Sequence, residues 1–84
     1  MEFLRLPVVL ARRQRSKASH YSDIAAGLCT RPVRIGLRAV CWPTVEIEAL
    51  QAARVRGASD QEVRALVEEL HAKRLTAGLE REAA

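Results

Sequence analysis

The sequence is poor in aromatic residues, with one Phe, one Tyr and one Trp among 84 residues. Proteins that recognise single-stranded RNA stack its bases on several aromatic side chains, so the composition disfavours that class. Cysteine is also scarce: Cys29 and Cys41 are too few for a disulfide scaffold. Neither cysteine pairs with His20 or His71 at the spacing of zinc ligands, so we expect no metal site.

Long apolar runs and catalytic motifs are missing as well. No segment approaches the roughly 18 apolar residues of a membrane span, and residues 1–5 lack the layout of a secretory signal. We therefore expect a cytoplasmic protein without a membrane partner. The sequence contains no Gly-rich phosphate loop and no nucleophile motif. We therefore expect a protein that is not an enzyme and that binds no cofactor and no small-molecule ligand.

What the sequence does have is an uneven distribution of charge. Residues 1–44 hold eight basic and two acidic side chains, whereas residues 45–84 hold six basic and eight acidic ones. The net charge of +4 therefore divides into +6 and −2. Such a split predicts one face for a polyanion and another for solvent or protein.

The first half of the chain carries the signals of two short helices joined by a tight turn. Pro7 suits the first turn of a helix over residues 7–13, because its missing N–H would be unpaired there. Ser16 can cap a second helix over residues 17–26, and Gly27 can end it in a left-handed conformation. The sequence therefore predicts a helix-turn-helix.

Helical spacing divides the second helix into two faces. The expected buried face comprises Ala18, Tyr21, Ile24 and Ala25. The outward face is small and polar, and four candidate contact residues lie at or beside its N-terminal half: Ser16, Lys17, Ser19 and His20. A helix that enters a major groove needs such a face, because its backbone must come close to the base edges. An ordinary solvated face would have the same composition.

After Gly27 the apolar pattern changes from helical to alternating. We expect a β-hairpin wing with strands at about 33–35 and 39–42, closed by a two-residue turn at Gly36 and Leu37. In this register one face comprises Val33, Ile35, Val40 and Trp42, while Arg34 and Cys41 face the other way. Three arginines are expected to form a rim around the wing: Arg31, Arg34 and Arg38. A guanidinium suits phosphate oxygens and narrow minor grooves.

Two further helices are predicted over residues 45–56 and 60–77. Thr44 is the expected cap of the third helix, whose apolar edge comprises Ile47, Leu50, Ala53 or Arg54, and Val55. The fourth opens on a capping box between Ser59 and Glu62 and is expected to end near Gly78. Its apolar stripe comprises Val63, Leu66, Val67 and Leu70. The expected organisation is a DNA-binding domain over residues 1–57 followed by an amphipathic helix with a frayed end over residues 58–84.

The residues resemble those of AlpA-type prophage regulators, within the excisionase-like and MerR-like winged helices. Residues 6–12 resemble the opening helix of that family, 16–21 its recognition helix, 31–42 its wing and 46–49 the start of its third helix. The chain departs from the family at His20, where an aliphatic residue is usual, and at Asp23, where the residue is more often apolar.

The resemblance implies a mainly α-helical winged helix-turn-helix that binds double-stranded DNA. Such a protein acts in the bacterial cytoplasm as a transcriptional regulator or as an excisionase-type architectural factor of a prophage or mobile element. The second helix would lie in the major groove, with Ser16, Lys17, Ser19 and His20 reading bases. Phosphates would be bound by Arg13, Arg15, Tyr21, Arg31, Arg34 and Arg38. His20 could instead face the domain.

Two uses compete for the apolar stripe of the fourth helix. It can close the core of the same chain, or it can pair with a second copy through Val63, Leu66, Val67 and Leu70. A protein-interaction module that docks on a partner through this helix is the alternative to DNA binding.

Overall fold

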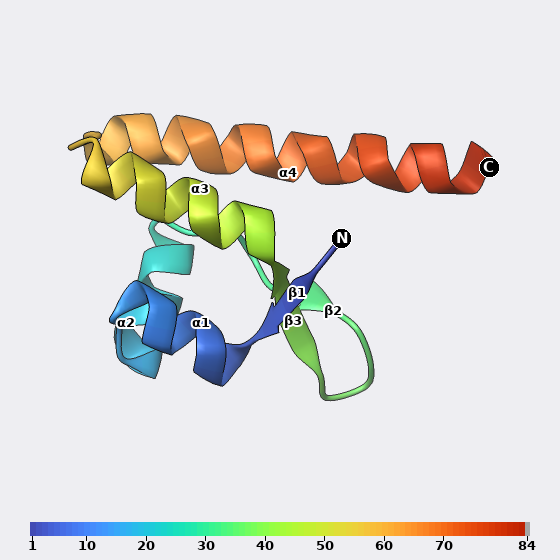
Figure 1. Ribbon diagram of the computed structural model, residues 1–84, viewed down its shortest axis with the longest axis horizontal. Coiled ribbons are helices and arrows are strands. Elements are labelled where there is room, and N and C mark those ends of the chain that lie inside the picture. Colours follow the sequence, from blue (N-terminus) through green and yellow to red (C-terminus); the bar gives the residue numbers. More distant parts are fainter. Residues whose placement is uncertain (84) are drawn as a thin grey trace.

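The computed structural model describes the backbone of residues 1–83 and the side chains of residues 1–76. Its elements in chain order are β1 (Phe3–Arg5), α1 (Leu6–Arg13), α2 (Lys17–Ala25), β2 (Val33–Arg34), β3 (Val40–Pro43), α3 (Thr44–Val55) and α4 (Asp60–Ala83). The fold is mainly helical with a small antiparallel sheet, and α3 lies between α4 and α1 (Figure 1). The predicted order of helices and hairpin is confirmed.

The first two helices follow the predicted signals. Pro7 lies in the first turn of α1, and Gln14 ends that helix in a left-handed conformation at φ 56°. The Ser16 hydroxyl caps α2 by accepting a hydrogen bond from the backbone N–H of Ser19 at 3.1 Å. Gly27, at φ 79°, turns the chain away after α2. A three-residue turn therefore joins two short helices.

The sheet has three strands in the order β1-β3-β2, and the edge strand β1 was not predicted. Leu4 lies opposite Trp42, so β1 pairs with β3 along its whole length of three residues. A segment this short shows too little alternation to identify a strand from sequence. Its strand geometry depends on the partner that tertiary folding supplies.

The hairpin register differs by one residue from the prediction. The backbone N–H of Ile35 donates to the carbonyl of Ala39 at 2.9 Å, so the hairpin loop comprises three residues, 36–38, instead of a two-residue turn. Val33 consequently lies opposite Cys41 and on the other face from Trp42. The expectation that Val33 and Ile35 share a face with Trp42 is wrong, and the side chain of Ile35 is 50 % exposed.

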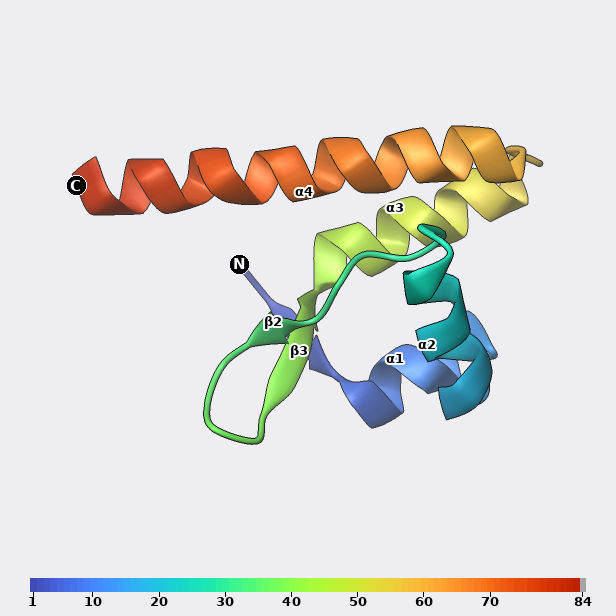
Figure 2. The ribbon, with the colours of Figure 1, turned by 180° about the vertical axis from the view of Figure 1, so that it is seen from behind.

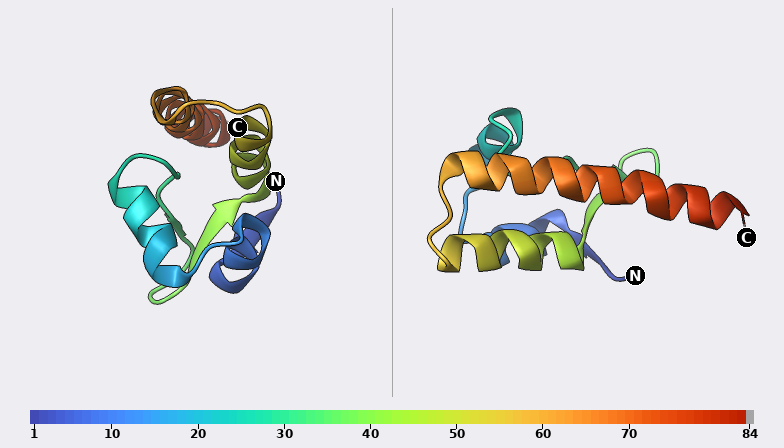
Figure 3. Two further views of the ribbon diagram at one scale, coloured as in Figure 1. Left: turned by 90° about the vertical axis from the view of Figure 1, so that its left-hand side faces the viewer. Right: turned by 90° about the horizontal axis from the view of Figure 1, so that it is seen from above.

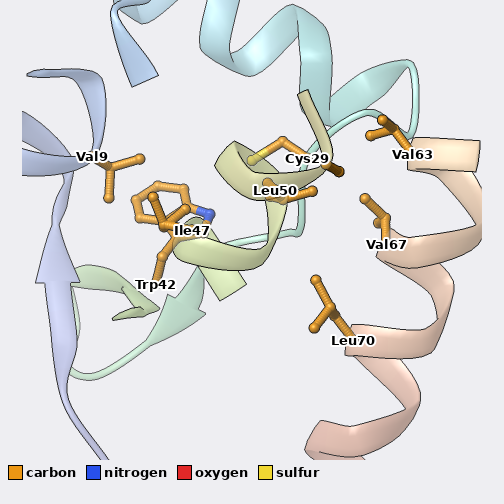
Figure 4. Packing of buried hydrophobic residues seen from close by; sticks show 9 residues of the cluster. Val9, Cys29, Trp42, Ile47, Leu50, Val63, Val67 and Leu70 are labelled. Atoms are coloured by element: carbon orange, nitrogen blue, oxygen red, sulfur yellow. The ribbon is translucent and has the colours of Figure 1, made fainter. Parts of the chain in front are cut away.

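The core centres on Trp42, which lies beside Val9 of α1 and Ile47 of α3, and α4 packs on the opposite side of α3 (Figure 4). Three of the four stripe residues of α4 are buried in it, namely Val63, Val67 and Leu70, and Leu66 packs against it. The stripe thus packs within its own chain. From α3 the core receives Ile47, Leu50 and Ala53, whereas Val55 is exposed, contrary to prediction.

The predicted start of α4 is confirmed, but its predicted end is wrong. Ser59 and Glu62 form a reciprocal capping box, each backbone N–H donating to the other side chain at 3.1 Å. The helix continues past Gly78 to Ala83. A glycine inside a helix costs only about 1 kcal/mol relative to alanine, and Gly78 does not stop this one. Residue 84 lies outside the described residues.

The expected capping role of Thr44 is also wrong. Thr44 is already the first residue of α3, Pro43 occupies the cap position, and no side-chain cap is formed. The backbone N–H of Thr44 donates instead to the carbonyl of Glu2 at 2.9 Å. The chain before β1 therefore provides one of the acceptors that the start of α3 needs.

Candidate nucleic-acid interface

The second helix and the hairpin loop lie on the same side of the molecule, away from α3. The views from behind and from above both show this arrangement (Figures 2 and 3). In Figure 1, α4 lies at the opposite edge of the protein. The two elements expected to contact DNA are thus brought to one face, which we call the α2–hairpin face. It comprises the exposed side of α2 and the exposed hairpin residues 34–38.

The buried side of α2 is rotated by about one residue from the prediction. Its buried or half-buried residues are Ser19, His20, Asp23 and Ile24, and its exposed residues are Lys17, Ala18, Tyr21, Ser22 and Ala25. Tyr21 is 38 % exposed, so its ring does not lie in the core as expected. The exposed side of α2 therefore combines small residues with a lysine, a serine and a tyrosine.

His20 is a core residue and does not lie on the outward face. Its side chain is fully buried, and its ring meets that of Trp42 edge-on with centroids 4.9 Å apart. The Nη1 atom of Arg13 lies 2.8 Å from Nδ1 of His20. Because a guanidinium can only donate, Nδ1 accepts and the neutral ring carries its proton on Nε2. Burial, followed by the nearby charge of Arg13, lowers the pKa of His20.

An ion cluster of Arg13, Arg15 and Asp23 fixes the turn between α1 and α2. The Asp23 carboxylate accepts from Nη2 of Arg13 at 3.0 Å and from Arg15 at 3.0 and 2.9 Å. Burial raises the pKa of Asp23, but the hydrogen bonds from Arg15 and Arg13 outweigh it and hold the pKa below its usual value. The Arg13 side chain is only 11 % exposed and that of Arg15 is 42 % exposed. Arg13 therefore serves the fold, and Arg15 reaches solvent only in part.

Hydroxyl groups at the start of α2 are partly committed to its cap. The Ser16 hydroxyl donates to Oγ of Ser19 at 3.0 Å while accepting from the Ser19 backbone N–H. Ser16 has therefore used its single donor, whereas the hydroxyl proton of Ser19 remains free to donate. Within the described residues, Lys17 takes part in no ion pair. Lys17 and Ser19 are the predicted contact residues that this helix leaves available.

The side chains of all three predicted rim arginines are exposed, but the backbone of Arg31 is bound by α4. Arg31 is held at α4, where its backbone N–H donates to Nε2 of His71 at 3.1 Å and its carbonyl accepts from Nη2 of Arg74 at 2.7 Å. Arg31 also lines a groove between α2 and α4 together with Arg64 and His71. No local pattern in the sequence indicates these contacts, because the residues they join lie 40 and 43 positions apart. Arg34 and Arg38 are exposed beside the loop.

Other kinds of site find little support among the described residues. No group of three His, Cys, Asp or Glu side chains there could hold a metal ion. Cys29 and Cys41 are buried free thiols whose pKa burial raises, so neither is activated as a nucleophile. No helix in the described part of the chain is long and apolar enough to cross a membrane.

No protein-family model, curated protein or solved structure matches the chain.

The lowered pKa values of the two histidines predict how the stability of the protein depends on pH. Burial is the main cause that lowers the pKa of both His20 and His71 in the folded protein. The unfolded chain, with histidine pKa values near 6.5, then binds protons that the folded chain does not, so stability is full above that pH and falls below it. We expect the free energy of unfolding, from urea titrations between about pH 7 and 5, to drop by up to about 1.4 kcal/mol per pH unit for each histidine.

Two single variants test whether His20 and His71 cause this pH dependence of the free energy of unfolding. His20→Gln and His71→Gln should each flatten the pH dependence, whatever they do to stability at neutral pH. A slope that both variants leave unchanged would assign the effect to other groups.

Proposed function

We propose that this protein binds double-stranded DNA as a winged helix-turn-helix regulator or architectural factor. The exposed side of α2 would enter the major groove, and the hairpin would follow the neighbouring phosphates into the minor groove. The charge of the α2–hairpin face carries this proposal. Asp23 is the only acidic residue between positions 3 and 45, and Arg13 and Arg15 bind its carboxylate. The side chains of Lys17, Arg34 and Arg38 are exposed, and no other carboxylate between positions 3 and 45 could neutralise their charge.

The residues on the exposed side of α2 support the proposal that this helix lies in the major groove. Ala18, Ser22 and Ala25 are small, so the helix backbone can approach base edges closely. Lys17 supplies donors from this side, the half-buried Ser19 adds a hydroxyl at its edge, and the exposed Tyr21 can place its hydroxyl on a phosphate. The buried His20 and the largely buried Arg13 are left out of the proposed contact set.

The alternative of a protein-interaction module that docks through α4 is less well supported. Such docking, like pairing with a second copy, needs the apolar stripe of α4 to be free. Val63, Val67 and Leu70 are at most 7 % exposed within the chain itself. Using them for a partner would require opening the core.

Salt dependence tests the proposal. Lys17, Arg34, Arg38 and the exposed part of Arg15 can bind about four phosphates, so log K should fall against log[salt] with a slope near −3 to −4. Fluorescence anisotropy with a duplex recovered from a random-sequence pool measures this slope.

Two variants test the hairpin arginines. Arg34→Ala and Arg38→Ala should each weaken binding to every duplex and lower the slope by about one.

Arg56→Ala provides the matched control, because Arg56 is an exposed arginine just past the end of α3. It should leave the slope unchanged. Binding that does not vary with salt, or an Arg56 effect as large as that of Arg38, would contradict the proposed interface.

A further inference from the structure

The tip of the hairpin carries an exposed aliphatic side chain where turns usually carry small or polar ones. Leu37 lies at the middle of the loop of residues 36–38 and is 95 % exposed, and Ile35 just before the loop is 50 % exposed. A single exposed leucine needs no explanation by itself. This one stands at the most prominent point of an element that also carries positive charge.

The groups beside Leu37 favour a polyanion as its partner. Arg34 and Arg38 are both exposed, and neither forms an ion pair with any residue that the structure describes. A narrow minor groove attracts guanidinium groups, and proteins that enter it often insert an apolar wedge between two base pairs. An aliphatic side chain flanked by two arginines has the chemistry of such a wedge.

The base of the hairpin is anchored firmly enough to hold a wedge in place. Trp42 and Cys41 are fully buried on β3, so exposure increases from the base of the hairpin to its tip. Two residues before β2, both backbone polar groups of Arg31 are bound by α4 through His71 and Arg74. A fixed arm loses little conformational entropy when its tip enters DNA.

We infer that Leu37 inserts between two base pairs from the minor groove and unstacks them. The inference rests on the proposed DNA binding and adds a specific contact to it. Arg34 and Arg38 would bind the phosphates on either side, and the leucine would fill the opened step. Pyrimidine–purine steps unstack most easily, so the inserted side chain would select such a step without forming a hydrogen bond to a base.

The test uses duplexes of about 30 base pairs recovered by the wild-type protein from a random-sequence pool. In these, 2-aminopurine replaces adenine at one position after another. This base brightens when it loses its stacking neighbour. At saturating wild-type protein we expect a severalfold rise in fluorescence at one step. Leu37→Ala should bind with the same salt slope and lose the rise.

Two variants serve as controls. Val55→Ala removes an aliphatic side chain that is 88 % exposed at the end of α3, and it should keep the rise. Arg38→Ala should need more protein to saturate the duplex but show the same rise once saturated. Circular dichroism should show the same fold for Leu37→Ala as for the wild type.

The outcomes separate this inference from the proposed function. A wild-type protein that binds the duplex without any rise, or a Leu37→Ala variant with an undiminished rise, would overturn the wedge and leave DNA binding standing. A wild-type protein that binds no duplex would remove both.

Discussion

Replacing Trp42 with alanine is expected to lower the free energy of unfolding by about 3 to 5 kcal/mol. The side chain is fully buried and packs between Val9, Ile47 and the ring of His20. Its indole N–H donates to the carbonyl of Thr30 at 2.9 Å, so the change also leaves a buried acceptor without its partner. A domain of this size is only marginally stable, and a loss of this magnitude should unfold most of it.

Urea titration followed by far-UV circular dichroism measures the effect, because the variant has no tryptophan fluorescence. Val55→Ala is the matched control and should change stability by no more than about 0.5 kcal/mol, since Val55 is 88 % exposed. A Trp42→Ala variant that unfolds at the wild-type urea concentration would mean that the core does not depend on this side chain.

Local signals in the sequence sufficed for most element boundaries. Ser16, Gly27 and the capping box of Ser59 and Glu62 act within three or four residues of themselves, and each lies where it was expected. Their effect is local because a cap binds backbone groups of its own helix, whatever the rest of the chain does. The burial of Val63, Val67 and Leu70 likewise follows from spacing along one helix.

Features that depend on contacts between distant segments could not be predicted. The hairpin register required knowing that Ile35 pairs with Ala39, and an error of one residue placed Val33 on the wrong face. Helical spacing alone does not decide whether His20 faces DNA or the domain, and it does not predict the inward position of Asp23. Arg13 makes their inward position favourable, since it binds both side chains at once. Arg13 lies on α1, so the spacing of residues within α2 does not reveal this contact.

Replacing Arg74 with methionine is expected to lower the free energy of unfolding by about 2 to 4 kcal/mol, because it leaves a buried carboxylate without its partner. Glu46 is 3 % exposed in the first turn of α3, and its oxygens accept from Nε and Nη2 of Arg74 at 2.7 and 2.6 Å. The Arg74 side chain is itself 22 % exposed, which keeps the loss below that of a fully buried pair. The same guanidinium holds the carbonyl of Arg31.

The neighbouring Lys73 gives a matched control on the same turn of α4. Its ion pair with Glu69 is solvent-exposed on both sides, 70 % and 62 %, so Lys73→Met should cost less than about 0.5 kcal/mol. The double variant Glu46→Leu/Arg74→Met should recover much of the loss, because it removes the buried charge together with its partner. If the double variant is as unstable as Arg74→Met alone, the loss comes from the Arg31 carbonyl and the packing of the arginine stem. Faster amide hydrogen exchange at Arg31 in both variants would then locate the damage at the base of the hairpin.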